Sequence, residues 1–230
     1  MAVAKLLAKL TVQFALTDIV MALCLFLPAG NWRWPEGWAF LAVFTAGGYL
    51  FCGWLAWRDP ALLAERLAPP VQKAQPWWDR VFLFGMVAGW CAWLVFMALD
   101  AQRWQTSHVP LALEALGALL ILGGFGAIVP VFDANSFAAP VVRVQTERKQ
   151  HVIDTGPYAW VRHPMYSASI LYLLGMPLLL GSWYGSIGSA LIVLAISWRA
   201  VGEERKLRDE LSGYADYMTR VRYRLVPGVW

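Results

Sequence analysis

The chain is poor in charged residues for its length. Charged residues make up 15% of the 230 positions, whereas hydrophobic residues make up 59%. An ordinary soluble domain is about 25% charged and roughly 45–50% apolar, so this composition argues against one. It predicts an integral membrane protein built as a bundle of a few spans.

Cysteine is also scarce, and its placement excludes two kinds of site. Cys24, Cys52 and Cys91 fall in three different apolar segments. An odd number of cysteines without short spacings does not indicate a disulfide framework or a zinc site, and we interpret them as small buried apolar residues.

The net charge of +4 is modest. We expect neither a metal nor a nucleic acid among the partners.

Several short motifs are missing as well. The GxGxxG and P-loop patterns do not occur, and Gly123-Gly124-Phe125-Gly126 is more typical of helix packing than of a phosphate cradle. A basic start at Lys5 and Lys9 would suit a signal peptide, but no small-residue cleavage site precedes Asn31.

Four apolar segments approach the length of about 20 residues that crosses a bilayer. They cover 7–27, 38–57, 81–99 and 109–131. A fifth apolar block, 166–198, is interrupted at 181–185, and each half is short for an independent span but suited to a helical hairpin. We predict an all-α polytopic membrane bundle of about six helices, the last two forming that hairpin.

The basic residues predict the orientation of this bundle. Of the 19 Lys and Arg residues, 17 fall on one side of the predicted membrane, and only Arg33 and Arg103 fall on the other. The positive-inside rule then places both termini on the cytoplasmic side. We predict an integral protein of a bacterial inner membrane, with its catalytic face towards the cytoplasm.

The most informative stretch is DTGPYAWVRHPMY, at 154–166. Such a polar, turn-rich strip beside a membrane segment must satisfy its backbone groups within the protein, so we expect it to line a cavity. Pro164 favours an extended residue 163 and the start of a helix, which places His163 at a helix N-terminus suited to an anion. An Arg162–His163 pair that only touches lipid headgroups is an equally good interpretation.

A second cluster follows the hairpin. Arg199 and Glu203 are four residues apart on a predicted helix and share a face. Such a pair is usually solvated, but here the helix leaves an apolar hairpin, which favours a face directed into a cavity. Glu203 and Glu204 are predicted to point to different sides, so a paired acid–base couple is not expected.

Two acidic residues lie within predicted spans, where ionisable groups are candidates for function. Asp18 is expected to cap a kink or to pair with a neighbouring helix. Glu114 is expected near water at the outer end of its span. Neither is assigned to catalysis.

The C-terminal half resembles the isoprenylcysteine carboxyl methyltransferase family and its relatives among the membrane phospholipid methyltransferases. The ordered pattern consists of Asn135-Ser136-Phe137, Gln145, HVIDTGPYAWVRHPMY, the apolar hairpin, Arg199, Glu203-Glu204, Leu207, Tyr214, Tyr217 and Val226-Pro227-Gly228. By this resemblance, 1–132 holds the N-terminal spans, and 133–230 is a cofactor-binding catalytic region with a cytoplasmic C-terminal helix.

The resemblance implies a cytosol-facing pocket for S-adenosylmethionine, formed by the two motifs. The residues implied in catalysis are Arg199, Arg162 and Tyr166. Those implied in cofactor binding are Gln145, His151, Val152, Gly156, Tyr158, His163, Tyr166, Glu203 and Glu204. Ala168 stands where members often have Gly, and Ser182 where eukaryotic enzymes tend to have Asn, which leaves the lipid substrate open.

We therefore predict an S-adenosylmethionine-dependent membrane methyltransferase similar to the protein-S-isoprenylcysteine O-methyltransferases. Its acceptor would be a carboxylate, or an amine, on a lipophilic or prenylated substrate or a membrane lipid. One alternative is an NADPH-dependent reductase of the sterol or steroid reductase type, which carries a similar RHPxY region. A second is a non-enzymatic membrane protein on the same scaffold.

Overall fold

The computed structural model describes residues 2–230, and every regular element in that range is helical. The helices are α1 (Ala2–Ala29), α2 (Pro35–Arg58), α3 (Pro60–Arg66), α4 (Trp77–Ala98), α5 (Leu111–Ala134), α6 (Pro164–Leu179), α7 (Gly185–Glu210) and α8 (Tyr214–Arg220). A π-helical turn, η1 (Leu99–Trp104), continues α4, and the loop before α6 contains two short 3-10 turns, η2 (Thr146–Arg148) and η3 (Gly156–Ala159).

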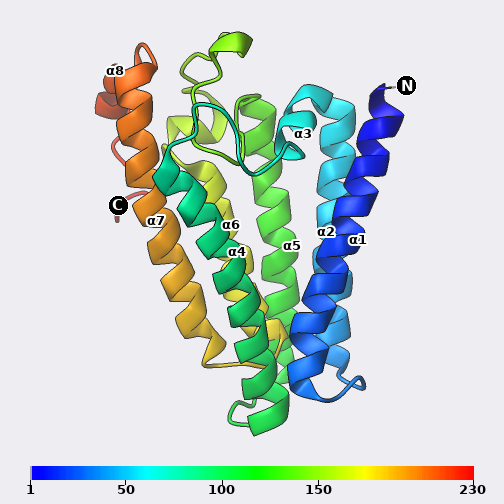
Figure 1. Cartoon of the computed structure of the whole chain (residues 1–230). Coiled ribbons are helices and arrows are strands. Elements are labelled where there is room, and N and C mark those ends of the chain that lie inside the picture. The colour runs from blue at the N-terminus through cyan, green and yellow to red at the C-terminus, as the bar shows by residue number, and fades with distance from the viewer. Residues whose placement is uncertain (1) are drawn as a thin grey trace.

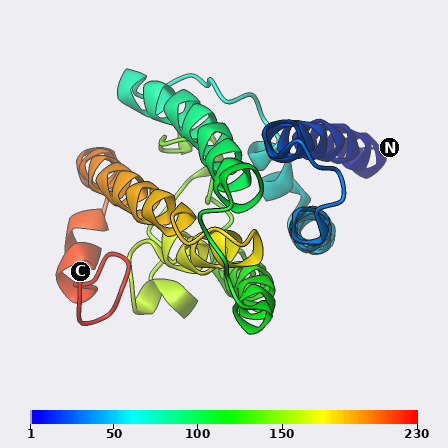
Figure 2. The ribbon, with the colours of Figure 1, turned by 90° about the horizontal axis from the view of Figure 1, so that it is seen from below.

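Five helices are long and apolar enough to cross a membrane. They are α1, α2, α4 with its η1 extension, α5 and α7, and the shorter apolar α6 stands among them (Figure 1). The prediction of an all-α membrane bundle with about six helices is confirmed. The view along the bundle shows α6 between α5 and α7 (Figure 2).

The two arms of the hairpin are unequal, which corrects the expectation that both are short. Helix α6 has 16 residues, and at 1.5 Å per residue it reaches about 24 Å, less than a hydrocarbon core of about 30 Å. Helix α7 has 26 residues. It continues through the polar sequence EERKLRDE because those residues are strong helix formers.

Helices α5 and α6 approach closely because glycines face each other between them. A Cβ atom built on Gly117 would lie 2.6 Å from the carbonyl oxygen of Gly175, and one on Gly124 would lie 3.1 Å from the backbone nitrogen of Tyr172. Small residues allow such backbone contact between membrane helices. Gly124 thus has the packing role predicted for its motif, whereas Gly123 and Gly126 face open space.

The acidic residues and cysteines of the predicted spans have different surroundings. Asp18 accepts a hydrogen bond of 2.7 Å from Thr45 on α2, so it pairs with a neighbouring helix. Glu114 lies in the first turn of α5. The three cysteines are free and half-buried rather than fully buried.

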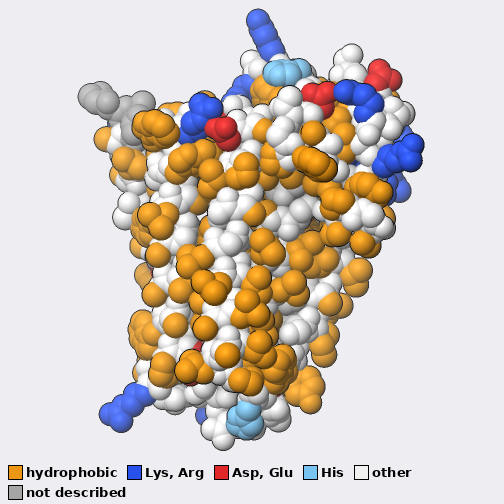
Figure 3. Space-filling view, turned by 180° about the vertical axis from the view of Figure 1, so that it is seen from behind, with side chains coloured by type: hydrophobic (Ala, Val, Ile, Leu, Met, Phe, Trp, Pro, Cys, Tyr) orange, Lys and Arg blue, Asp and Glu red, His pale blue; other side chains and the backbone are white. Residues whose placement is uncertain are grey.

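Apolar side chains cover the middle of the bundle, and charged ones gather at the end that carries the N-terminus (Figure 3). Both termini lie toward that end (Figure 1). The apolar band has the position expected of a lipid-facing surface.

The unequal distribution of basic residues makes the topology testable. In a cysteine-free background, Lys5→Cys and Val229→Cys should be labelled by an impermeant maleimide from the same side of the membrane. Arg33→Cys and Arg103→Cys should be labelled only from the other side. Labelling of positions 5 and 229 from opposite sides would rule out this arrangement.

Candidate active site

The motif before α6 is held by backbone pairing with the C-terminal segment. The backbone N–H groups of Arg162 and His163 donate to the carbonyls of Tyr223 and Arg224, each at 2.9 Å. His163 is the residue before the first turn of α6, with φ −124°, and Pro164 begins the helix. The helix start at Pro164 is confirmed, whereas the ψ of His163 is 61°, which lies outside the extended range that was predicted. This pairing fixes the direction in which the His163 ring leaves the backbone.

Glu204 is the centre of a buried ionic cluster. Its carboxylate accepts from Arg162 Nε at 2.6 Å and from Arg224 Nε at 2.9 Å, and His163 Nε2 lies 3.3 Å away. The Glu204 side chain is only 3% exposed. Arg162 also donates to the carbonyls of Val221 and Arg222. The cluster therefore ties α7, the motif and the C-terminal segment together.

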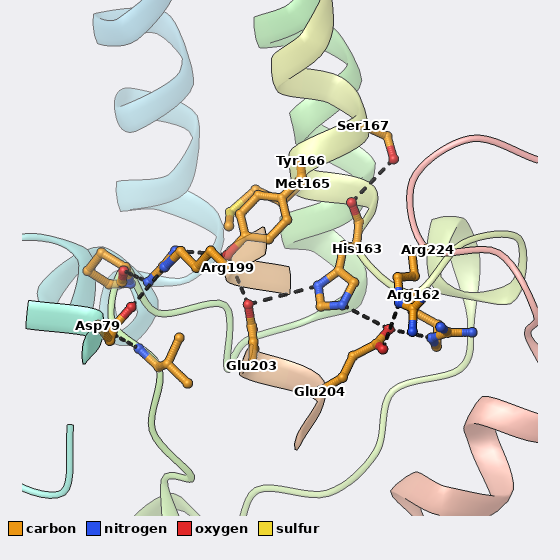
Figure 4. Close-up of polar contacts among 12 residues, drawn as sticks. Asp79, Arg162, His163, Met165, Tyr166, Ser167, Arg199, Glu203, Glu204 and Arg224 are labelled. Carbon is orange, nitrogen blue, oxygen red and sulfur yellow. Dashed lines mark hydrogen bonds and ion pairs between the residues drawn. The ribbon is translucent and has the colours of Figure 1, made fainter. Parts of the chain in front are cut away.

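Glu203 occupies the other side of His163 and is much less constrained. It accepts a hydrogen bond of 2.9 Å from the Tyr166 hydroxyl, and its carboxylate lies 3.9 Å from His163 Nδ1. Its side chain is 27% exposed. The two glutamates were predicted to point to different sides of the helix, but both are directed to the motif, with the His163 ring between them (Figure 4). The two carboxylates are close enough for the His163 ring to lie beside both.

Arg199 is buried and uses three of its N–H groups within the protein. Its Nε donates to Asp79 at 2.8 Å, Nη1 to the Tyr166 hydroxyl at 2.8 Å, and Nη2 to the carbonyl of Pro140 at 2.7 Å. A guanidinium has five N–H donors, so one on each Nη remains. The interpretation of Arg199 and Glu203 as a solvated surface pair is wrong, because Arg199 is buried and pairs with Asp79.

A cavity of about 90 Å³ opens beside these groups. Seven of the predicted site residues line it, and these are His151, Val152, Tyr158, Arg162, His163, Tyr166 and Glu203. The loop after α5, the start of α6, the end of α7 and α8 supply its walls. Residues more than forty positions apart therefore meet at one place, as the hairpin path predicted.

Four other predicted residues lie outside this lining. Arg199 and Glu204 are held in the pairs described above. Gln145 is fully buried and donates to the carbonyl of Phe137 at 2.7 Å, which shapes the loop. Gly156 has φ +57°, a conformation that favours glycine, and it begins η3. Their proposed contacts with a cofactor remain predictions.

Three tyrosines on the cavity wall are protonated at neutral pH. Burial raises the pKa of Tyr158, Tyr214 and Tyr217 above the usual value for a phenol. Tyr217 donates its hydroxyl hydrogen to the carbonyl of Tyr158 at 2.8 Å. These side chains supply aromatic faces and hydroxyl donors rather than bases.

The donor set suits a cofactor with cationic, hydroxyl and aromatic parts. Glu203 can meet an ammonium or ribose hydroxyls, and tyrosine rings favour a neighbouring cation. Arg143 lines the same cavity, and its buried Nε has no hydrogen-bond partner. The chemistry therefore fits S-adenosylmethionine. The cavity volume of about 90 Å³ is below the range of about 300–1,000 Å³ for ligand pockets.

The structure adds site residues that sequence patterns did not single out. Asp79 comes from the first turn of α4, and Arg224 from the chain end. Tyr214 and Tyr217 belong to the recognised pattern but were not assigned a role. Asp79 has no local signal, because its partner Arg199 is 120 residues away. Within the described residues, no group of three or more His, Cys, Asp or Glu could hold a metal ion.

Residues 113–211 match the family model described as phospholipid methyltransferase. This segment belongs to the phospholipid methyltransferase family. That family includes the isoprenylcysteine carboxyl methyltransferases, so the resemblance of the motifs is confirmed. The matched segment runs from α5 to Leu211 and contains His163, Tyr166 and both glutamates. No curated protein matches the chain.

The match of residues 113–211 indicates a membrane methyltransferase in the general sense. Its matched range holds the motif, the hairpin and α7, but the walls of the site extend beyond it on both sides. Asp79 precedes the range, and Tyr214, Tyr217 and Arg224 follow it.

Proposed function

We propose that the chain transfers a methyl group from S-adenosylmethionine to a lipophilic acceptor at the cytoplasmic face of a bacterial inner membrane. The observation that carries this proposal is the partly exposed Glu203 beside His163 and Tyr166 on a cavity wall, within the segment that matches the methyltransferase family. Members of the family generally use this cofactor. The surplus of Lys and Arg at the same end supports the cytoplasmic assignment.

In this proposal, Glu203, His163 and Tyr158 hold the cofactor, and Arg199 faces the acceptor. The cofactor supplies an electrophilic methyl group. A carboxylate acceptor is ionised at neutral pH and needs no general base. The chain then has two tasks, which are alignment of the reactants and exclusion of water. The remaining N–H groups of Arg199 can orient the acceptor carboxylate.

An apolar groove supports a lipophilic acceptor. It has a volume of about 590 Å³ and lies between α4 and α7, with Gly85, Gly89 and Leu191 among its lining residues. A Cβ atom at Gly85 or Gly89 would meet nothing within 4 Å. These two glycines leave room on the α4 side for an acyl or isoprenoid chain.

The groove leads toward Arg199. Phe82 lines the groove, and the Arg199 guanidinium carbon lies 5.5 Å from the centre of its ring. Phe82 also stacks on Trp198 at 6.0 Å. A lipid chain in the groove would therefore carry its head group to the guanidinium, and an entry from the bilayer needs no opening of the bundle.

Cofactor binding separates this proposal from its alternatives. Titration calorimetry of the purified protein in detergent should show saturable binding of S-adenosylhomocysteine and none of NADPH. The sterol or steroid reductase alternative predicts the reverse, and the non-enzymatic alternative predicts no binding of either. Transfer of a radiolabelled methyl group to N-acetyl-S-farnesylcysteine, whose amine is blocked, or to phosphatidylethanolamine in vesicles would then identify a carboxylate or an amine acceptor.

A further inference from the structure

The strongest unassigned feature is Asp79, a carboxylate that is completely buried where three parts of the chain meet. Its Oδ1 accepts from Arg199 Nε on α7 at 2.8 Å. Its Oδ2 accepts from Gln75 Nε2 at 2.8 Å and from the backbone N–H of Val142 at 2.9 Å. One side chain on α4 therefore fixes both α7 and the loop that walls the cavity.

Asp79 determines the orientation of Arg199. The carboxylate holds the guanidinium at Nε, while Phe82, one turn along α4, faces the guanidinium with its ring. This leaves Nη1 to bind the Tyr166 hydroxyl and Nη2 to bind the Pro140 carbonyl. A buried guanidinium without a carboxylate partner is strongly disfavoured, so the pair with Asp79 stabilises Arg199 in this orientation.

The same carboxylate also balances the charge of the site. Asp79 pairs with Arg199, and the Tyr166 hydroxyl links Arg199 to Glu203. Glu204 pairs separately with Arg162 and Arg224. Asp79 is thus the carboxylate that pairs with Arg199, whereas Glu203 is linked to Arg199 only through the Tyr166 hydroxyl.

We propose that Asp79 is a positioning residue for the acceptor side of the site, acting through Arg199. This inference rests on the proposed methyl transfer. It extends the site to α4, outside the matched segment 113–211. Helix α4, which forms one wall of the apolar groove, would then also orient Arg199, the residue proposed to bind the acceptor head group.

Asparagine cannot replace Asp79, although its shape is the same. Donors face both carboxylate oxygens, and an amide has only one oxygen, so its NH₂ group must oppose a donor. Asp79→Glu keeps the charge but moves the carboxylate by one methylene. Because a misplacement of about 1 Å can cost about 100-fold in rate, we expect turnover to fall at least about tenfold in both variants.

The test is a double-mutant cycle in methyl-transfer turnover at saturating S-adenosylmethionine. It compares wild type, Asp79→Asn, Arg199→Gln and the double variant, with N-acetyl-S-farnesylcysteine and phosphatidylethanolamine as acceptors. If Asp79 acts through Arg199, Asp79→Asn should cost less than about twofold once Arg199 is replaced. The affinity for S-adenosylhomocysteine should stay within about twofold of wild type in the Asp79 variants, since the acceptor side alone is disturbed.

The matched control is Asp133→Asn, which removes a carboxylate from an exposed pair with Arg58 and should change nothing. Three results would each overturn the inference. The first is normal turnover of Asp79→Asn or Asp79→Glu, and the second is additive losses in the cycle. The third is a loss of cofactor affinity equal to the loss of turnover. If Asp79→Asn does not fold, Asp79→Glu decides by the same criteria. Wild-type protein that binds no S-adenosylhomocysteine and methylates neither acceptor would overturn the proposed function, and this inference with it.

Discussion

Replacement of Glu203 by alanine is expected to weaken S-adenosylhomocysteine binding about 10- to 100-fold, because hydrogen bonds to a charged group contribute about 1.5–3 kcal/mol. His163→Ala should have a similar effect, since the ring lies on the same wall. Titration calorimetry measures both. The melting temperature of Glu203→Ala should hardly change, because this side chain makes one hydrogen bond and is partly exposed.

The neighbouring glutamate provides the contrast. Glu204→Ala removes the partner of two arginines in a buried cluster, and breaking such a pair costs about 3–5 kcal/mol of stability. Its main effect should therefore be a lower melting temperature. Asp209→Ala, on the exposed side of the same helix, is the control and should alter neither quantity. Unchanged affinity in both Glu203→Ala and His163→Ala would reject the cofactor assignment.

Filling the groove between α4 and α7 is the second change with a large expected effect. Gly85→Leu and Gly89→Leu place a side chain where an added Cβ meets open space. If each displaces about two methylene groups of the acceptor chain, the cost is about 1.6 kcal/mol, or about 15-fold in the KM for the acceptor. Steady-state kinetics with a series of acceptor chain lengths measures this, and short chains should be affected least.

Gly53→Leu on α2 and Gly126→Leu on α5 are matched controls, because both positions also face open space but lie outside the groove. All four substitutions favour the helix, since leucine has a higher helix propensity than glycine. The affinity for S-adenosylhomocysteine should be the same in the four variants. An equal effect of the groove and control substitutions on KM would mean that the groove holds only bulk lipid.

Much of the architecture could be predicted from composition and local pattern. Apolar segments of bilayer length predict spans because the hydrocarbon core excludes unsatisfied backbone groups. The bias of Lys and Arg predicts orientation separately, because short loops rich in Lys and Arg stay on the cytoplasmic side. Pro164 also predicted the start of α6, since proline suits the first position of a helix, whereas the extended conformation predicted for His163 is not found.

The contents of the site depended on the tertiary structure. Glu203 and Glu204 are adjacent and chemically identical, yet one is enclosed by Arg162 and Arg224 while the other reaches the cavity. Asp79 could not be linked to Arg199 from the sequence, because a contact between distant residues leaves no periodic or local pattern. Helical periodicity assigns a residue to a face, but only the packing of α4 against α7 and the loop determines which charge is neutralised and which remains free for a ligand.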